Sequence, residues 1–313
     1  MKKSNIENSS FRWKVNKFPF YFSLRLLWGS KPKCVYVYSP NILFFGLYLV
    51  CKIRGIELVI EKTELDSIKP LENKKDYVNH ILYKLDELIS PFFANKLVVI
   101  SSKLASYYQT KVKKVFKIGA FIPYHALQNI QSQTTNNQDF TIGYFGTFAK
   151  KDDTQRLINV FQKLQKQIPS SKLHLVGSVR NVTFKNENIV LFGEIENHQI
   201  VSELSKCDVL IAIREKNDYS DYGFPSKFTE YFMTKKPIIA SKSSEIPDLF
   251  AHKKELILIE PENEKQLLDA IIWVKENTTE ARQIGETGFN WAMQHWHPDV
   301  VLKKWYDFVI SNK

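Results

Sequence analysis

The chain has 313 residues, of which 44% are hydrophobic and 25% are charged. This composition is typical of a globular protein and excludes a disordered or fibrous one. At roughly 150 residues per domain, the length predicts two domains. The three cysteines, Cys34, Cys51 and Cys207, are odd in number and far apart. They indicate neither a disulfide framework nor a zinc site, and they favour a reducing cytoplasm.

The net charge of +11 is confined to one half of the chain. Residues 1–140 hold 21 Lys and Arg against 10 Asp and Glu, whereas residues 141–313 hold 23 of each. Residues 1–33 alone carry eight basic residues and one acidic residue, Glu7. This asymmetry predicts an anionic partner, for which nucleic acid and the cytoplasmic membrane leaflet are both candidates.

The N-terminal region raises the question of membrane contact. No apolar run with a cleavage site follows the opening MKKSN, so we expect no export signal. From Phe11 to Trp28, aromatic residues alternate with basic ones, which fits either an amphipathic interfacial segment or a core helix with a solvated basic face. The apolar run from Val35 to Cys51 is interrupted by Ser39-Pro40-Asn41. It therefore predicts a strand, a turn and a buried helix rather than a membrane span.

Short apolar runs alternate with helical patterns along both halves of the chain. In the first half CVYVY, IELVI, KLVVIS and KVFKIGAFI predict strands, with helices near 42–52, 77–89 and 103–109. A polar segment, 127–139, predicts a linker. TIGYFG, LHLVG, IVLFG, DVLIAI, PIIAS and ELILI then predict six more strands, with helices at 157–168, 264–276 and 300–310. Two successive βα arrays predict two Rossmann-like parallel-sheet domains, with the ligand site in the cleft between them.

A glycine loop follows the first strand of the second half. In GYFGTFAKKDD, Gly146 and Thr147 come directly after the strand, and Lys150 and Lys151 precede the next helix. Glycine allows close approach of a phosphate to the backbone, and a nearby ammonium group supplies the countercharge. GxGxxG and P-loop motifs are both absent from the sequence.

The segment YGFPSKFTEYFMTKKPIIAS, from Tyr222 to Ser241, predicts a second phosphate contact. Its Gly-Phe-Pro turn leads into a helix expected to start near Ser226, whose first N–H groups can face a pyrophosphate. Lys227 and Glu230 are three residues apart and therefore share one face of that helix. A carboxylate there suits the two hydroxyl groups of a ribose, which it can accept as a bidentate partner. The alternative is a surface pair between Lys227 and Glu230.

These motifs resemble the nucleotide-binding signature of family 4 glycosyltransferases, which have the GT-B fold. The resemblance covers residues 34–313 and rests on Gly146, DVLIAIR, the P-x-K-x-x-E-Y pattern at Pro225 to Tyr231, KPIIAS and the closing WHPDVVLKKWYDF. It implies an acceptor-side domain at 1–126, a linker at 127–139, a nucleotide-sugar domain at 140–298, and a C-terminal helix at 299–313 that crosses back to the first domain.

The resemblance implies a hexosyltransferase that needs no metal or cofactor and retains the anomeric configuration. Its donor would be a UDP- or GDP-linked sugar, and its acceptor a glycan or lipid-diphosphate-linked glycan of bacterial surface polysaccharide. The implied location is the inner face of the membrane, with the basic half toward the anionic lipid and with no nucleic-acid partner. The residues implied to bind the donor are Gly146, Thr147, Lys150, Lys151, Gly223, Phe224, Pro225, Ser226, Lys227 and Glu230, and those on the acceptor side are Glu61 and Glu64.

Three features depart from the family pattern. Tyr222 stands where a second glutamate often contacts the donor sugar, and Thr147 stands where an arginine commonly follows the loop glycine. The family's opening strand and glycine-rich acceptor loop have no counterpart, so the first domain is expected to be short. Two alternatives therefore remain: a non-catalytic homologue that binds nucleotide or membrane as a partner subunit, and a GT-B sugar-nucleotide epimerase.

Overall fold

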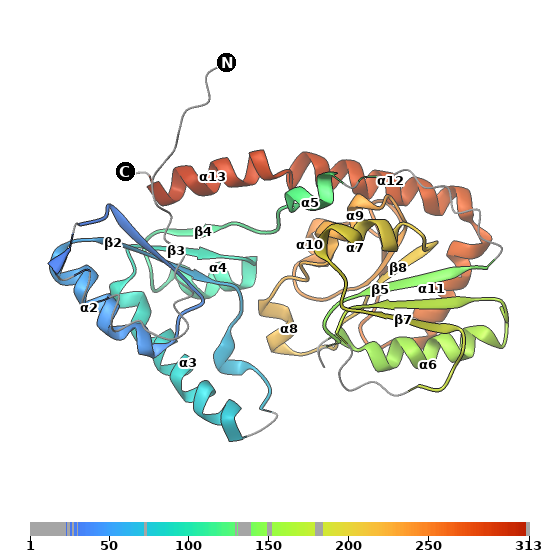
Figure 1. Cartoon of the computed structure of the whole chain (residues 1–313), viewed down its shortest axis with the longest axis horizontal. Coiled ribbons are helices and arrows are strands. Elements are labelled where there is room, and N and C mark those ends of the chain that lie inside the picture. The colour runs from blue at the N-terminus through green and yellow to red at the C-terminus, as the bar shows by residue number, and fades with distance from the viewer. Residues whose placement is uncertain are drawn as a thin grey trace, which may run out of the picture.

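A computed structural model shows two parallel-sheet α/β domains side by side, joined along one edge by the C-terminal helices (Figure 1). The structure describes residues 31–71, 74–128, 139–148, 152–178 and 184–310, together with Ser23, Leu26, Trp28, Gly29 and Ile130. Most of the predicted basic segment 11–28 and most of the predicted linker 127–139 lie outside these residues, as do Lys150 and Lys151.

The first domain is a four-stranded parallel sheet in the order β1-β2-β3-β4. Its central strands are apolar on both faces, as expected where other elements cover both sides of a parallel sheet. The strands are β1 (Cys34–Tyr38), β2 (Glu57–Lys62), β3 (Lys96–Val99) and β4 (Val115–Lys117). The helices are η1 (Ile42–Phe44), α2 (Phe45–Arg54), η2 (Asp66–Ile68), α3 (Lys74–Phe93) and α4 (Ser102–Gln109). Farther along the chain, α5 (Tyr124–Gln128) packs in the core of the second domain through Ala126.

The apolar run from Val35 to Cys51 forms a strand, a turn and a helix, as its Ser-Pro-Asn interruption predicts. Ser39 adopts a left-handed backbone with φ 42° and donates its N–H to the Glu61 carbonyl. The Asn41 side chain then accepts from the Leu43 N–H and caps η1. No helix within the described ranges is long and apolar enough to cross a bilayer.

The fourth strand is shorter than the predicted KVFKIGAFI run. β4 ends at Lys117, and the chain then leaves the first sheet for the second domain. There the Ile122 N–H donates to the Trp296 carbonyl at 2.9 Å, and Ile122 is fully buried in the second domain's core. The residues after Lys117 are therefore apolar because they are buried against the second domain. In the sequence, such a buried segment cannot be distinguished from a strand.

The second domain is a six-stranded parallel sheet in the order β10-β9-β8-β5-β6-β7. The order reverses between β8 and β5, and ligands of open α/β sheets bind outside the carboxyl ends of the strands at such a switch point. The strands are β5 (Thr141–Phe145), β6 (Lys172–Val176), β7 (Ile189–Gly193), β8 (Val209–Ala212), β9 (Ile238–Ser241) and β10 (Ile257–Ile259). The helices are α6 (Thr154–Gln165), α7 (Asn197–Leu204), α8 (Asp218–Tyr222), α9 (Phe228–Met233), α10 (Ile246–Leu249), α11 (Glu264–Glu276), α12 (Thr278–His295) and α13 (Pro298–Ile310).

The last two helices run along both domains (Figure 1). α13 packs on the first sheet, where Val309 is buried against Val59 and Val98. The Lys96 ammonium donates to the Val309 carbonyl at 3.0 Å, and the Phe308 ring stacks on Phe116 at 5.1 Å. These contacts attach the end of the chain to the domain in which it began.

The sequence analysis did not predict helix α12, because glycines interrupt its helical pattern. A Cβ at Gly285 would lie 2.4 Å from the Lys235 carbonyl oxygen, and one at Gly288 would lie 2.5 Å from the Glu255 carbonyl oxygen. These two glycines therefore let the helix backbone pack directly on the loops before β9 and β10. Glycine ordinarily weakens a helix, so its presence here reflects packing rather than helix propensity.

Replacing Gly285 by alanine is expected to destabilise the protein by about 1–3 kcal/mol, because the added methyl group must displace backbone atoms. Gly46→Ala in α2 is the matched control, since its added Cβ meets only the Ser23 hydroxyl at 3.9 Å. That change is expected to stabilise by up to about 1 kcal/mol through helix propensity. Urea unfolding midpoints of the two variants test this, and equal shifts would contradict the close packing of α12.

Candidate functional site

A cavity of about 650 Å³ lies between the two domains. Residues just beyond the carboxyl ends of the strands line it from both sheets. The first domain contributes Tyr38, Thr63, Glu64 and Ile100. The second contributes Phe145, Gly146, Thr147, Asp152, Gly177, Ser178, Glu194, Ile195, Asn197, Ile200, Arg214, Phe224, Pro225, Ser226, Lys227 and Glu230. Among the predicted donor-binding residues, all those in described parts except Gly223 therefore line one cavity.

The glycine loop after β5 is tightly packed against its neighbours. The Gly146 N–H donates to the Val176 carbonyl, and a Cβ at Gly177 would come within 1.9 Å of the Gly146 oxygen. A Cβ at Gly146 would lie 2.6 Å from the Tyr144 hydroxyl and 3.2 Å from the Lys227 ammonium. The loop thus needs glycine at both positions, and Gly146 places its backbone beside a buried cation.

Lys227 pairs with Asp152 and not with Glu230. Its ammonium lies 3.0 Å from the Asp152 carboxylate and donates to the Tyr144 hydroxyl at 3.1 Å, and both side chains of the ion pair are nearly inaccessible to solvent. Burial alone would raise the pKa of Asp152, but the charges of Lys227 and Arg214 hold it below its usual range. Asp152 was missed by sequence reasoning, which considered only the lysines of the KKDD segment.

Arg214 is a second buried cation that sequence reasoning did not assign to the site. It is 5% exposed, and it stands two residues after the end of the apolar strand β8, at the switch point. The backbone N–H donates to the Ser241 hydroxyl, and one guanidinium NH₂ group donates to the Ser220 carbonyl at 3.1 Å. The buried Nε has no hydrogen-bond partner among the described residues. Burial lowers the pKa of this guanidinium, while the nearby Asp152 and Glu64 carboxylates oppose that shift.

Glu230 lies half-buried at the edge of the same cavity. Its carboxylate accepts a hydrogen bond from the Thr229 hydroxyl at 2.8 Å. Burial raises its pKa, and the bond from Thr229 only partly offsets that rise. The remaining acceptor capacity of this carboxylate is available to hydroxyl groups in the cavity.

Helix α9 begins later than predicted. It starts at Phe228 rather than near Ser226, because Pro225 and Ser226 form a turn whose carbonyls accept from the N–H groups of Phe228 and Thr229. Those two amides are therefore already bonded within the turn. The positive charge near this turn comes instead from the Lys227 and Arg214 side chains.

The two predicted acceptor-side glutamates occupy different places. Glu64 lines the cavity, and its carboxylate accepts from the Tyr219 hydroxyl of the second domain. Glu61 lies outside the cavity lining, where it accepts from the Tyr36 hydroxyl. Tyr36 in turn accepts from the Trp305 indole N–H of α13 at 3.2 Å. Glu61 therefore supports the packing of α13 on the first domain, and only Glu64 faces the cleft.

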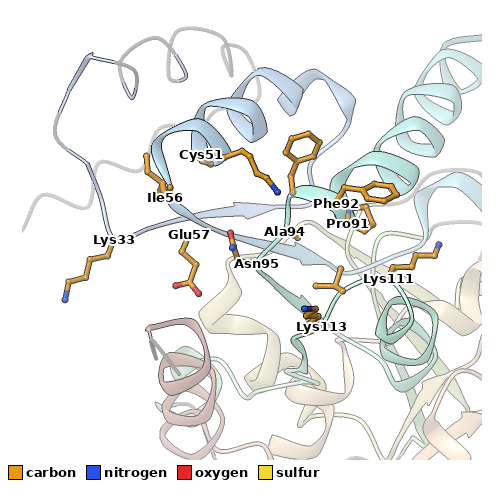
Figure 2. A pocket seen from close by; sticks show the side chains of 14 residues that line it. Lys33, Cys51, Ile56, Glu57, Pro91, Phe92, Ala94, Asn95, Lys111 and Lys113 are labelled. Carbon is orange, nitrogen blue, oxygen red and sulfur yellow. The ribbon is translucent and has the colours of Figure 1, made fainter.

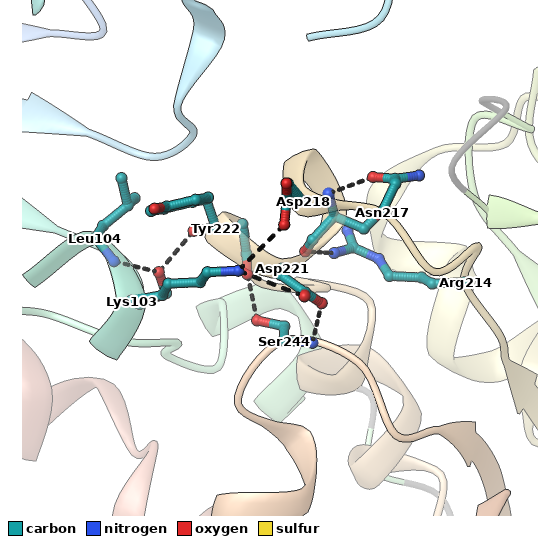
Figure 3. Close-up of polar contacts among 11 residues, drawn as sticks. Lys103, Leu104, Arg214, Asn217, Asp218, Asp221, Tyr222 and Ser244 are labelled. Carbon is teal, nitrogen blue, oxygen red and sulfur yellow. Dashed lines mark hydrogen bonds and ion pairs between the residues drawn. The ribbon is translucent and has the colours of Figure 1, made fainter. Parts of the chain in front are cut away.

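Polar contacts between α4 and α8 hold the two domains together beside the cavity (Figure 3). The Ser101 hydroxyl donates to the Tyr222 carbonyl at 2.6 Å, and Lys103 lies 3.5 Å from Asp221 and 4.6 Å from the centre of the Tyr222 ring. Tyr222 replaces the glutamate that the family pattern often has at this position. Its ring contacts Lys103 and Tyr107 of the first domain, outside the residues that line the cavity.

No group of three or more His, Cys, Asp and Glu side chains that could hold a metal ion is found among the described residues. Charge in the cavity is instead carried by the buried set Asp152, Arg214 and Lys227, with the carboxylates of Glu64, Glu194 and Glu230 also among its lining residues. The three buried groups comprise two cations and one carboxylate next to the glycine loop, and the Glu64 carboxylate also lies near Arg214. Such an arrangement can bind an anion, since a buried cation needs a countercharge.

Comparison with known proteins assigns this fold and sequence to a family. Residues 127–291, more than half of the chain, match the family described as glycosyl transferases group 1. The chain belongs to this family. It is therefore a group 1 glycosyltransferase of two parallel-sheet domains in the GT-B arrangement. Among curated proteins, no match was found.

Solved structures of GT-B glycosyltransferases share the fold at low sequence identity. S. aureus TarM has a TM-score of 0.72 and 15% identity over 93% of this chain, which spans 57% of that protein. Anabaena HepE in complex with UDP-glucose has a TM-score of 0.65 and 14% identity, and the match covers 88% of this chain and 78% of the HepE chain. Sucrose-phosphate synthase from Thermosynechococcus elongatus has a TM-score of 0.65 and 13% identity, and the match covers 90% of this chain and 74% of that protein.

Asp152→Asn is expected to destabilise the group 1 glycosyltransferase by about 3–5 kcal/mol at pH 7, because it leaves the buried Lys227 without its partner charge. The pKa of Asp152 is lowered on folding, so its contribution is present above its ordinary pKa of 3.8 and is lost as the pH falls through the lower folded value. The difference in the free energy of unfolding between wild type and variant should thus stay constant down to about pH 5 and decrease at lower pH. Urea unfolding at a series of pH values measures it.

The exposed pair Lys265–Asp269, at 2.6 Å, is the control for this prediction. Asp269→Asn is expected to cost less than about 1 kcal/mol because both partners are solvated. If Asp152→Asn cost no more than Asp269→Asn, the buried pair would not be a structural constraint of the site.

Proposed function

We propose that this group 1 glycosyltransferase transfers a hexose from a nucleoside diphosphate sugar to a glycan or lipid-linked glycan. The observation that carries the proposal is the pair of buried cations, Arg214 and Lys227, which line one cavity with the half-buried carboxylate of Glu230. Two fixed cations match the charge of a diphosphate, and a carboxylate at the cavity edge matches the hydroxyl groups of a ribose. The HepE complex with UDP-glucose and a TarM complex with UDP support a uridine-linked donor.

In this proposal catalysis is electrostatic. Negative charge accumulates on the diphosphate as its bond to the sugar breaks, and Arg214 and Lys227 lie ready to stabilise it without reorganisation. The Arg214 Nε provides an N–H donor that the protein itself leaves unused. Arg214 also supplies the guanidinium that the family pattern places after the loop glycine, where this chain has Thr147. These side chains supply the countercharge that a metal ion provides in other transferases, so we propose transfer without metal or other cofactor, with retained configuration.

We also propose where the acceptor binds and where in the cell the reaction takes place. The acceptor would enter from the first domain, where Tyr38 and Glu64 face the donor side of the cavity. A complex of TarM with an α-GlcNAc-glycerol compound supports a glycan acceptor. Surface polysaccharide assembly at the cytoplasmic face of the membrane fits the basic first half of the chain, because lipid-linked acceptors lie at that surface.

Calorimetric titration with UDP, GDP, ADP and CMP tests the donor site. One nucleoside diphosphate, UDP on this proposal, is expected to bind tightly. Glu230→Ala should weaken that binding by at least about 1–2 kcal/mol, because it removes an acceptor of ribose hydroxyl bonds. Glu276→Ala, an exposed carboxylate on α11, is the control and should change nothing. No binding by any of the four nucleotides would overturn the proposal.

The pH dependence of UDP binding gives a second check on Glu230. Its pKa is raised by burial, so the carboxylate is expected to gain a proton at a higher pH than an ordinary glutamate does. Protonation removes acceptor capacity, and UDP affinity should then fall. Glu230→Gln should bind more weakly at pH 8 and show a flatter profile. An identical profile in the variant would assign the ribose contact to another group.

Arg214→Gln is expected to lower kcat for UDP release from UDP-sugar in the presence of acceptor by about 100-fold or more, as for loss of one preorganised donor at a developing anion.

Nuclear magnetic resonance of the UDP-sugar alone separates the remaining alternatives. Conversion of the donor without acceptor would indicate an epimerase, and nucleotide binding without any turnover would indicate a non-catalytic homologue. Transfer only with acceptor present supports the proposed reaction.

A further inference from the structure

Helix α3 buries two carboxylates and exposes a stripe of apolar side chains. On the inward side Asp86 accepts from Lys62 and from Tyr48, each at 2.6 Å, and Glu87 accepts from the Ser67 N–H at 3.1 Å. The outward side displays Val78, Ile81, Leu85, Leu88 and Phe92, which are 41–66% exposed except for Phe92 at 76%. Helices of soluble domains ordinarily bury their apolar side, so this reversal indicates that the outer stripe meets an apolar environment.

Helix α2 extends this apolar surface. Phe45, Leu49 and Ile53 are spaced four residues apart on one side of the helix, and all three are exposed, Ile53 by 76%. The Phe45 ring packs edge-on against Phe93 of α3 at 5.7 Å, which places the two helices next to each other. We call the exposed apolar residues of these two helices the α2–α3 face.

A basic cavity adjoins the end of this face (Figure 2). It has a volume of about 800 Å³ and is lined by Lys33, Lys52, Lys111 and Lys113 as well as by Phe92 of the apolar stripe. Figure 2 shows Phe92 and Pro91 from the end of α3 on the same side of the cavity as Lys111. Glu57 also lines the cavity, but its carboxylate is paired with the buried Lys96 at 2.9 Å.

The sign of the exposed charge decides what this face can bind. Within the described residues 31–128, every fully exposed charged side chain is a lysine, whereas each described carboxylate there is buried or half-buried. Two copies of the face would bring lysines against lysines, which disfavours self-association. The N-terminal 33 residues, with eight basic residues and one acidic, have the same sign and are no better matched.

We propose that the α2–α3 face docks on a bilayer containing anionic lipid, with the α3 stripe at the boundary between headgroups and acyl chains. Aromatic and aliphatic residues beside lysines are the composition that binds such an interface, and the basic cavity next to Phe92 receives a lipid phosphate. The site is separate from the donor cavity, because none of its residues lines the cleft. The face therefore holds the enzyme at the membrane while the cleft binds nucleotide.

Flotation of the full chain with vesicles tests this surface. Binding is expected to vesicles of phosphatidylcholine with phosphatidylglycerol and to be at least tenfold weaker with phosphatidylcholine alone. Leu88→Gln with Phe92→Gln should weaken binding to the anionic vesicles at least fivefold, and Lys111→Glu with Lys113→Glu at least tenfold. Leu191→Gln with Val300→Gln, and Lys166→Glu with Lys185→Glu, are exposed control pairs at sites in the second domain and in α13.

Thermal unfolding and UDP titration of each variant complete the experiment. Unchanged UDP affinity and melting temperature show that only docking was altered, so a failure of the membrane proposal is distinguishable from a failure of the donor-site proposal. Absence of binding to anionic vesicles, or binding unaffected both by the Leu88 and Phe92 changes and by the Lys111 and Lys113 changes, would overturn the inference. Loss of a dimer in sedimentation velocity with Leu88→Gln and Phe92→Gln, with vesicle binding unchanged, would assign the face to a second copy.

Discussion

Three buried charges at the carboxyl end of the second sheet constrain the rest of the site. Lys227, Asp152 and Arg214 are removed from water. Lys227 pairs with Asp152 at 3.0 Å, whereas Arg214 forms no close ion pair with a carboxylate of the described residues. Removing an unmatched charge from water is costly unless a partner is supplied. The glycines at 146 and 177, the Tyr144 hydroxyl and the Ser220 carbonyl all lie where they accommodate or solvate these groups. On the proposed function, the diphosphate of the donor binds next to these two cations.

The two domains differ in charge, in exposed apolar surface and in their contribution to the cleft. The second domain has balanced charge, and it contributes most of the side chains around the cleft. The first domain contributes few residues to the cleft but displays an apolar face surrounded by lysines. α13 and the contacts between α4 and α8 hold the two together, so that the cleft and the α2–α3 face belong to one assembly. An enzyme that acts on a lipid-linked acceptor has use for both features.

Several parts of this structure were predictable from the sequence, for a common reason. Buried parallel strands are short apolar runs, and each of the ten runs read as strands contains a strand of the structure, although β4 is much shorter than its run. Gly146, Lys227 and Glu230, which local motifs singled out, line one cavity of the structure. Asp152 and Arg214 were missed because their surroundings come from distant parts of the chain: Asp152 pairs with Lys227, 75 residues away, and Arg214 lies near Glu64 of the first domain. Helix α12 was missed because its glycines reflect contact with other loops, which helix propensity does not encode.

By itself the sequence determined the fold class, the order of the strands along the chain and the uneven distribution of charge, since these follow from local hydrophobic patterns and composition. Only the tertiary structure decided which charges pair, that Glu64 faces the cleft while Glu61 packs beneath α13, and that α3 turns its apolar side outward. Helical periodicity shows that a helix has two different sides. Which side is buried depends on the neighbours that the fold brings to it, and here Lys62 and Tyr48 draw Asp86 inward.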